Sequence, residues 1–243
     1  MQKHTFIDRY FHSQKELLDF RHTDEQDINT LYTYLNNLHS VGDKLKELFG
    51  CDIKSSPDFK ILRIIRNYFH HVGDVNEVRL IAAFEENVVA SHSQHIIIPL
   101  ETFAKSLKSF IDNNVVEGRK DYKRKMEFVA KELATITSNF SYMNDILQNM
   151  EVSCNKPSLK LDGKVYELGF DMYKFVYNIT NLIAEHCKNI EALSNKACVQ
   201  ELDESYSVAN NIGKIDLWCS PNKMPVTTMQ GMIYAKESIE LAI

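Results

Sequence analysis

Residues 24–49 contain the pattern that most restricts the fold, because their apolar side chains recur at spacings of three and four. The members of this stripe are Ile28, Leu31, Leu35, Leu38, Val41, Leu45 and Leu48. Such spacing predicts an amphipathic helix, and the acidic residues in its first turn suit the helix dipole. Gly50 is expected to end it. With only 8 glycines and 5 prolines in 243 residues, the chain favours long helices over many short strands.

Further start and stop signals divide the rest of the chain. Ser56 as N-cap and Pro57 at the first helical position predict a helix to about Val72, with Gly73 as a left-handed cap. The segments 88–100 and 159–166 predict, respectively, a strand before Pro99 and a hairpin around Asp162-Gly163. Helices are also expected over 75–87, 100–113, 119–150 and 167–195.

These patterns predict a mainly α fold, a bundle-like single domain over 1–243 with a small β-hairpin element. The sequence shows no internal repeat, low-complexity tract or interdomain linker. The tail after Asp203 mixes glycine, proline and short apolar runs, and it predicts no particular element.

Composition limits the environment and the partners. The formal net charge of −5 argues against a general nucleic-acid coat protein but leaves room for a local basic site. Five dispersed cysteines without a Cys-x-x-Cys pair suit reduced thiols. Charges and histidines occupy the N-terminus where a signal peptide needs an apolar run, and no stretch reaches the length of a membrane span. We therefore expect a cytoplasmic protein with no membrane partner.

The hexapeptide Arg66-Asn67-Tyr68-Phe69-His70-His71 carries the main functional signal. On an ideal helix, its polar residues and the preceding Arg63 fall within an arc of about 140°, opposite an apolar face. A guanidinium, a carboxamide and an imidazole on one surface can hold a phosphate and move protons without a metal or cofactor. The plainer interpretation is that basic groups near a helix C-terminus suit the dipole, at about 0.3–1 kcal/mol each.

Arg66-Asn67-x-x-x-His71 resembles the signature of the HEPN family, in which an arginine, often followed by asparagine, precedes a histidine by four to six residues. The resemblance covers about residues 24–150, and it leaves 151–243 as a C-terminal helical and hairpin extension. It implies a HEPN-like helical bundle and a metal-independent endoribonuclease without cofactor. Many such enzymes are homodimers whose motifs meet at the interface, found in toxin–antitoxin and antiphage systems.

The resemblance also implies roles for individual residues. Arg66 would bind the scissile phosphate of RNA, His71 would transfer the proton of the ribose 2′-OH or of the leaving oxygen, and Asn67 would orient the site. Arg63 and His70, on the same arc, would contact the substrate. An antitoxin protein is a further partner that this class implies.

Two features keep alternatives open. Some HEPN toxins carry a tyrosine two residues after the histidine, where this chain has Gly73, and other members of the family are non-catalytic. The alternative function is a non-catalytic helical module that binds RNA, nucleotide or a protein partner through the same basic patch. A third is a structural protein in which the patch is a polar dimer seam.

Weaker signals lie elsewhere. The window Gly118–Lys125 holds five cations around a tyrosine and could track an RNA backbone, although charge runs are more often only solvated. His92 and His95 lack further ligands at zinc spacing, so no metal site is predicted. Cys187 and Cys198 are expected to be small buried apolar groups.

Overall fold

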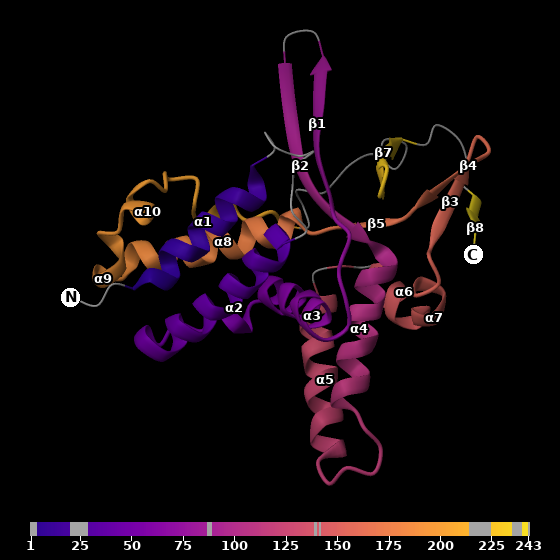
Figure 1. Cartoon of the computed structure of the whole chain (residues 1–243), viewed down its shortest axis with the longest axis horizontal. Helices are drawn as coiled ribbons and strands as arrows, with labels where there is room; N and C mark the ends of the chain where they lie inside the picture. The colour runs from indigo at the N-terminus through magenta and orange to yellow at the C-terminus, as the bar shows by residue number, and fades with distance from the viewer. Residues whose placement is uncertain are drawn as a thin grey trace. The chain divides into compact units, whose positions relative to one another are not determined.

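The computed structural model describes residues 4–19, 29–86, 89–138, 140, 142–213, 225–234 and 240–242 (Figure 1). Its contacts divide the chain into two compact units, each built from two separate stretches of sequence. Unit 1 comprises residues 1–66 and 174–213, and unit 2 comprises residues 67–173 and 214–243. The division falls within a helix that is itself continuous.

Unit 1 is helical, and its elements are α1 (Thr5–Leu18), α2 (Asn29–Phe49), a 3-10 turn η2 (Ile53–Ser55), most of α3 (Pro57–His71), α8 (Tyr173–Asn189), α9 (Glu191–Ser194), α10 (Ala197–Gln200) and η3 (Val208–Asn210). Two fully buried tyrosines, Tyr10 and Tyr34, connect α1 with α2 at a ring-centroid distance of 5.8 Å. The Tyr10 hydroxyl also hydrogen-bonds Thr180 Oγ1 of α8 at 2.9 Å. The three helices thus share one core.

The predicted boundaries of α2 and α3 are confirmed where the structure describes them. Gly50, the predicted end of α2, donates its N–H to the Lys46 carbonyl at 3.1 Å and adopts φ +70, so it forms a left-handed cap. The Ser56 carbonyl accepts the first helical hydrogen bond, from Lys60 at 3.1 Å, so α3 begins at Pro57. Residues 24–28, the predicted start of α2, lie outside the described residues.

Gly73 was predicted to be a left-handed cap as well, and this is wrong. It is not among the glycines with positive φ, and a Cβ added there would meet no atom within 4 Å. Both Val72 and Gly73 instead donate to the Tyr68 carbonyl, at 2.8 and 3.4 Å. A hydrogen-bonded turn therefore ends α3 without a left-handed residue.

These two glycines give a matched pair for a stability test. Gly50→Ala is expected to lower the free energy of unfolding by about 1–2 kcal/mol, because an L-residue is strained in the left-handed region. Gly73→Ala should leave it unchanged or raise it by up to about 1 kcal/mol, because it only restricts the unfolded chain. Urea unfolding of both variants measures the difference, and equal losses would contradict the assigned caps.

Unit 2 contains the described strands, all paired antiparallel. One sheet has the order β1 (Val78–Glu86), β2 (Val89–Pro99), β5 (Gly169–Asp171), and a second has the order β4 (Lys164–Glu167), β3 (Ser158–Leu161), β8 (Glu240–Ala242). A third pairs β6 (Pro225–Thr228) with β7 (Gly231–Tyr234). The predicted strand before Pro99 and the hairpin around Asp162-Gly163 are confirmed. Both turn residues have positive φ, as a tight hairpin turn requires.

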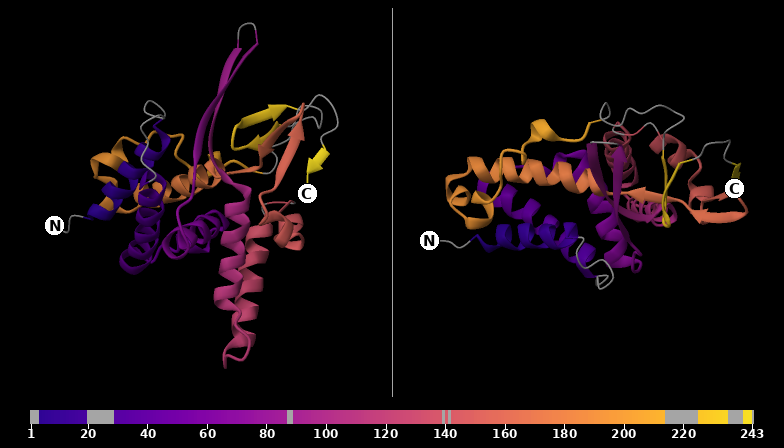
Figure 2. Two further views of the ribbon diagram at one scale, coloured as in Figure 1. Left: turned by 45° about the vertical axis from the view of Figure 1, so that its right-hand side comes forward. Right: turned by 90° about the horizontal axis from the view of Figure 1, so that it is seen from above.

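The helices of unit 2 are α4 (Leu100–Asn114), α5 (Tyr122–Thr137), α6 (Tyr142–Gln148) and α7 (Met150–Ser153). Consecutive in the chain, α4 and α5 lie side by side as a helical hairpin (Figure 2). The core at the sheet end of α4 includes Phe103, whose ring stacks on Phe170 of β5 at 3.8 Å. Aromatic stacking thus joins α4 to the first sheet.

Three predicted helices are wrong in part. Within the segment 75–87, residues 78–86 form strand β1, because β2 pairs with them residue by residue from Val78–Ile97 to Glu86–Val89. The segment 119–150 is broken after Thr137, where the hydroxyls of Thr137 and Ser138 bond nearby carbonyls and compete with the helix. The segment 167–195 begins with the last residue of β4 and with β5, where Gly169 lets the backbone approach β2, since an added Cβ would lie 2.3 Å from Ile97 Cγ2.

The fold is mainly helical with small antiparallel sheets, which agrees with the predicted class and contains more β structure than one hairpin. Within unit 1, α8 shares a core with α1 and α2, although more than 100 residues of chain separate it from them. Across the described helices, none is both long enough and apolar enough to cross a membrane.

Candidate functional site

The predicted site residues all lie on α3, whose inner face is built as the sequence indicates. Ile61, Leu62, Ile64 and Ile65 are buried in the core. On the opposite face, Arg63, Arg66 and Asn67 are half-buried, and His70 and His71 are exposed. Val72, which would lie on the apolar side of an ideal helix, is 55% exposed because the helix has already ended at His71. The helix therefore presents its polar residues increasingly to solvent toward its C-terminus.

Arg66 is oriented by a neighbouring helix. Its Nε donates a hydrogen bond to the Asn36 Oδ1 of α2 at 3.0 Å. The carboxamide of Asn36 accepts this hydrogen bond without bringing a negative charge of its own, and the contact orients the guanidinium. An oriented arginine is the group best suited to hold a phosphate.

His39, also on α2, adds a titratable group that the sequence analysis missed. Its Nδ1 lies 3.1 Å from the Asp43 carboxylate, which also pairs with Lys54. Burial, then the charge of Lys54, and more weakly those of Arg66 and Arg63, lower the pKa of His39 despite the opposing effect of Asp43. At neutral pH a neutral imidazole therefore lies in the electrostatic surroundings of Arg66.

The signal that could have identified these residues is their spacing on α2. Asn36, His39 and Asp43 recur at intervals of three and four, so they share one face of the helix. That face is polar within a helix whose other face is the predicted apolar stripe. Only the packing of α2 against α3 in unit 1 shows that this face meets Arg66.

His70 and His71 occupy the last turn of α3. Their ring centroids lie 4.8 Å apart with an interplanar angle of 57°, and both side chains are exposed. Helix geometry places Arg66 one turn before His70 and Asn67 one turn before His71. The arrangement thus combines an oriented cation with two solvent-accessible imidazoles on one continuous helix, and such groups can bind a phosphate and transfer protons.

Other polar clusters have structural explanations. His95 Nδ1 lies 2.7 Å from Asp171 Oδ2, and Asp171 Oδ1 accepts the backbone N–H groups of Ile96 and Tyr173 at 3.1 and 2.9 Å. This carboxylate ties β2 to β5 and to the start of α8. Within the described ranges, no three His, Cys, Asp or Glu side chains form a group that could hold a metal ion.

The cysteines singled out by the sequence differ in their surroundings. Cys187 is fully buried, as predicted, and burial raises the pKa of its thiol to about 12. Cys198 is only half-buried, and its Sγ donates to Asp8 Oδ1 at 3.3 Å. Burial and this carboxylate raise the pKa of Cys198 to about 11, so both thiols are protonated at neutral pH.

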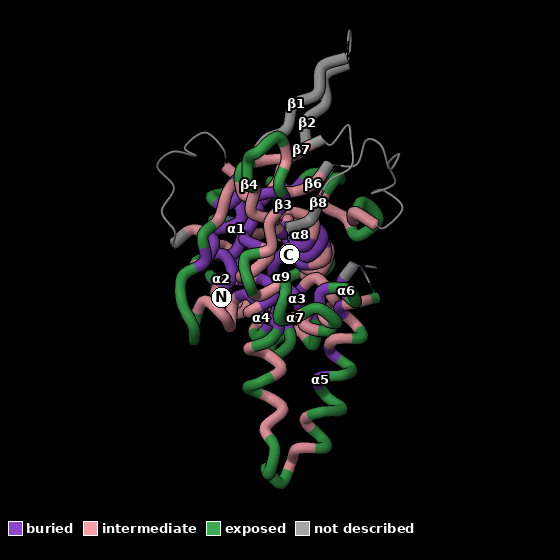
Figure 3. The backbone as a smooth tube through the Cα atoms, turned by 90° about the vertical axis from the view of Figure 1, so that its right-hand side faces the viewer, coloured by how far each residue is buried: buried purple, intermediate pink, exposed green. Residues whose placement is uncertain are grey.

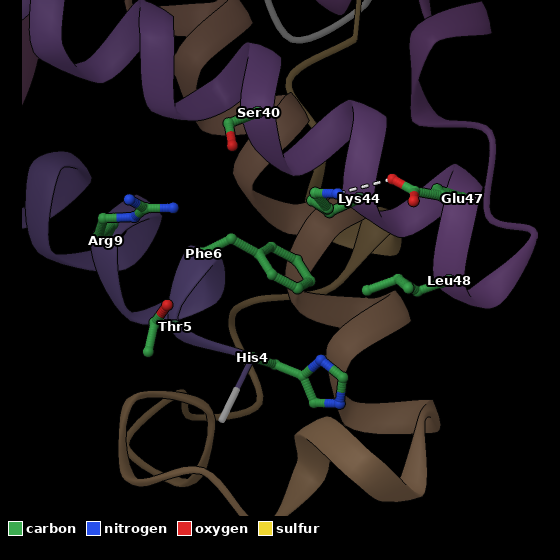
Figure 4. A pocket seen from close by; sticks show the side chains of 8 residues that line it. All are labelled: His4, Thr5, Phe6, Arg9, Ser40, Lys44, Glu47 and Leu48. Carbon is green, nitrogen blue, oxygen red and sulfur yellow. Dashed lines mark hydrogen bonds and ion pairs between the residues drawn. The ribbon is translucent and has the colours of Figure 1, made fainter. Parts of the chain in front are cut away.

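A separate cavity of about 420 Å³ lies between α1 and α2 (Figure 4). Phe6 and Leu48 line it with apolar surface, and Arg9 and Lys44 bring positive charge to its polar side. Lys44 is paired with Glu47 at 2.7 Å, so part of this charge is neutralised. No residue of the α3 motif lines this cavity.

Comparison with known proteins adds no relative to this description. No protein-family model, curated protein or solved structure matches the chain.

Proposed function

We propose that this chain is a cytoplasmic, metal-independent endoribonuclease of the HEPN type. Arg66, Asn67 and His71 form its catalytic centre, and Arg63 and His70 contact the RNA. The observation that supports this most is the pairing of an oriented Arg66 with exposed imidazoles one turn further along α3. The site needs no bound group, because an arginine and a histidine supply the charge and the proton transfer.

The reaction that suits these groups is internal transesterification of RNA. The ribose 2′ oxygen attacks the adjacent phosphorus, the bond from phosphorus to the 5′ oxygen breaks, and a 2′,3′-cyclic phosphate remains. A base takes the 2′ proton, and an acid gives a proton to the departing 5′ oxygen. His71 performs one of these transfers, Arg66 stabilises the charge that develops on the phosphoryl oxygens, and Asn67 holds the site by hydrogen bonding.

We also propose a homodimer, because the two proton transfers call for two groups and each protomer contributes one His71. An RNase that acts on cellular RNA must be restrained in its host. A toxin or antiphage effector silenced by an antitoxin protein therefore fits this activity.

The test is cleavage of a labelled RNA in the presence of EDTA. The expected result is cleavage that leaves a 2′,3′-cyclic phosphate, with a 2′-deoxy oligonucleotide of the same sequence left intact because it lacks the nucleophile. Activity that needs added Mg²⁺, or equal cleavage of the deoxy strand, would falsify the mechanism. Binding of RNA without any cleavage would favour the non-catalytic module.

A further inference from the structure

The connection between α4 and α5 carries a cluster of positive charge, residues 119–125, hereafter the basic tip. Its seven residues include five cations and a single carboxylate, Asp121, in a chain whose formal net charge is −5. Arg119, Lys120, Lys123 and Arg124 are exposed. Such a reversal of sign at one place creates a positive field toward which an anionic partner is steered.

The basic tip is not explained by the packing of the hairpin. From Lys108 to Phe128 no residue is buried, so this end of α4 and α5 is a thin pair of helices without a core of its own (Figure 3). Among the described residues, Arg119, Lys120 and Lys123 form no ion pair, and Asp121 lies 3.5 Å from Arg124 alone. The cations therefore repel one another in the free protein.

The positions of these cations within α5 add a second unfavourable interaction to their mutual repulsion. Lys123, Arg124 and Lys125 lie in the first turn of the helix, which contains no acidic residue, and the Asp121 side chain makes no capping hydrogen bond. Cations are unfavourable at the positive end of a helix dipole. An anion bound at the basic tip would reduce both the repulsion between the cations and their unfavourable interaction with the helix dipole.

An aromatic ring accompanies the charges. Phe128 is 41% exposed and lies one turn beyond Arg124 on α5. Lys125 Nζ sits 5.6 Å from the centre of its ring and donates to Asn114 Oδ1 of α4 at 3.2 Å. The ring of Phe110 on α4 lies 6.3 Å away. These contacts hold the Phe128 ring in place while leaving part of it accessible to a stacking base.

We propose that the basic tip binds the backbone of single-stranded RNA, with Phe128 available to stack on a base. Because the cations are spread over several residues, they match the successive phosphates of a polymer better than they would match a single compact anion. A partly exposed ring suits stacking on unpaired bases. That the polymer is RNA rests on the proposed function. The surface would then hold the substrate of that same activity through residues other than those of the catalytic centre.

Anisotropy of a short fluorescent oligouridine tests this, using full-length protein with His71→Ala so that the RNA stays intact. The triple variant Arg119→Gln, Lys120→Gln, Lys123→Gln should bind roughly ten- to a hundredfold more weakly at low salt. The slope of log affinity against log salt should become shallower by about 2, since each phosphate contact on a single strand contributes about 0.7. Circular dichroism melting checks that the variant is folded.

The matched control is Lys156→Gln, Lys160→Gln, Lys164→Gln, which removes the same charge from exposed positions around the β3–β4 hairpin. It should leave both affinity and slope near those of the parent. Equal weakening by the two triples, or stronger binding to anionic lipid vesicles than to RNA, overturns the proposal. The tip substitutions are also made in protein that retains His71. If they leave its metal-independent RNA cleavage unaffected, the proposal for the basic tip is overturned and the proposed function stands. If RNA binding depends on the basic tip but the native protein does not cleave RNA, the binding proposal is supported and the proposed nuclease activity is rejected.

Discussion

Replacing His71 by alanine is expected to reduce the rate of RNA cleavage by roughly 10²–10⁴-fold. Under the proposed function the imidazole transfers a proton, and alanine has no group that can replace it. Because His71 is exposed at the end of α3, the substitution removes no core contact, and the free energy of unfolding should change by less than about 0.5 kcal/mol. Single-turnover cleavage in EDTA and urea unfolding measure the two quantities separately.

His70→Ala is the matched control, because His70 is the same residue type, equally exposed and adjacent in the chain. Under the proposed function His70 contacts the substrate without transferring a proton, so its loss should alter KM with at most a roughly tenfold change in kcat/KM. If both variants lose activity equally, His71 has no special role in proton transfer. If His71→Ala retains the parental rate, the catalytic assignment fails.

The sequence was sufficient for those parts of the fold that local chemistry decides. The apolar spacing in α2, the pair Ser56-Pro57 before α3 and the turn at Asp162-Gly163 each act through residues close in the chain. Gly50 belongs with them, since its left-handed φ follows directly from its place after the helix. In these places the structure agrees with what a short window predicts.

Other parts depend on partners distant in the sequence. Residues 78–86 become a strand because β2 supplies their hydrogen bonds, and 169–171 add to the same sheet across some 70 residues of chain. The same limit applies to the site. Arg66 and the histidines of α3 could be identified locally, but its hydrogen bond to Asn36 and the presence of His39 depend on how α2 packs.

The largest loss of stability is expected from Phe103→Ala in unit 2. Phe103 is fully buried on α4, and its ring lies parallel to that of Phe170, with centroids 3.8 Å apart and an interplanar angle of 6°. The ring of Phe140 lies near that of Phe170, with centroids 6.5 Å apart. Removing the ring leaves a cavity and ends the stacking, so the free energy of unfolding should fall by about 3–5 kcal/mol.

Phe128→Ala serves as the control for this prediction. It removes the same side chain from α5, where Phe128 is 41% exposed, and should cost less than about 1 kcal/mol. Urea denaturation, monitored by circular dichroism and not by tryptophan fluorescence, compares the two variants directly. Similar losses for both would show that the Phe103–Phe170 stack does not anchor α4 to the sheet. A large loss of unfolding free energy for Phe103→Ala alone would show that the α4–α5 hairpin is stabilised mainly at its sheet end. Charged residues of the basic tip could then be replaced with little effect on stability.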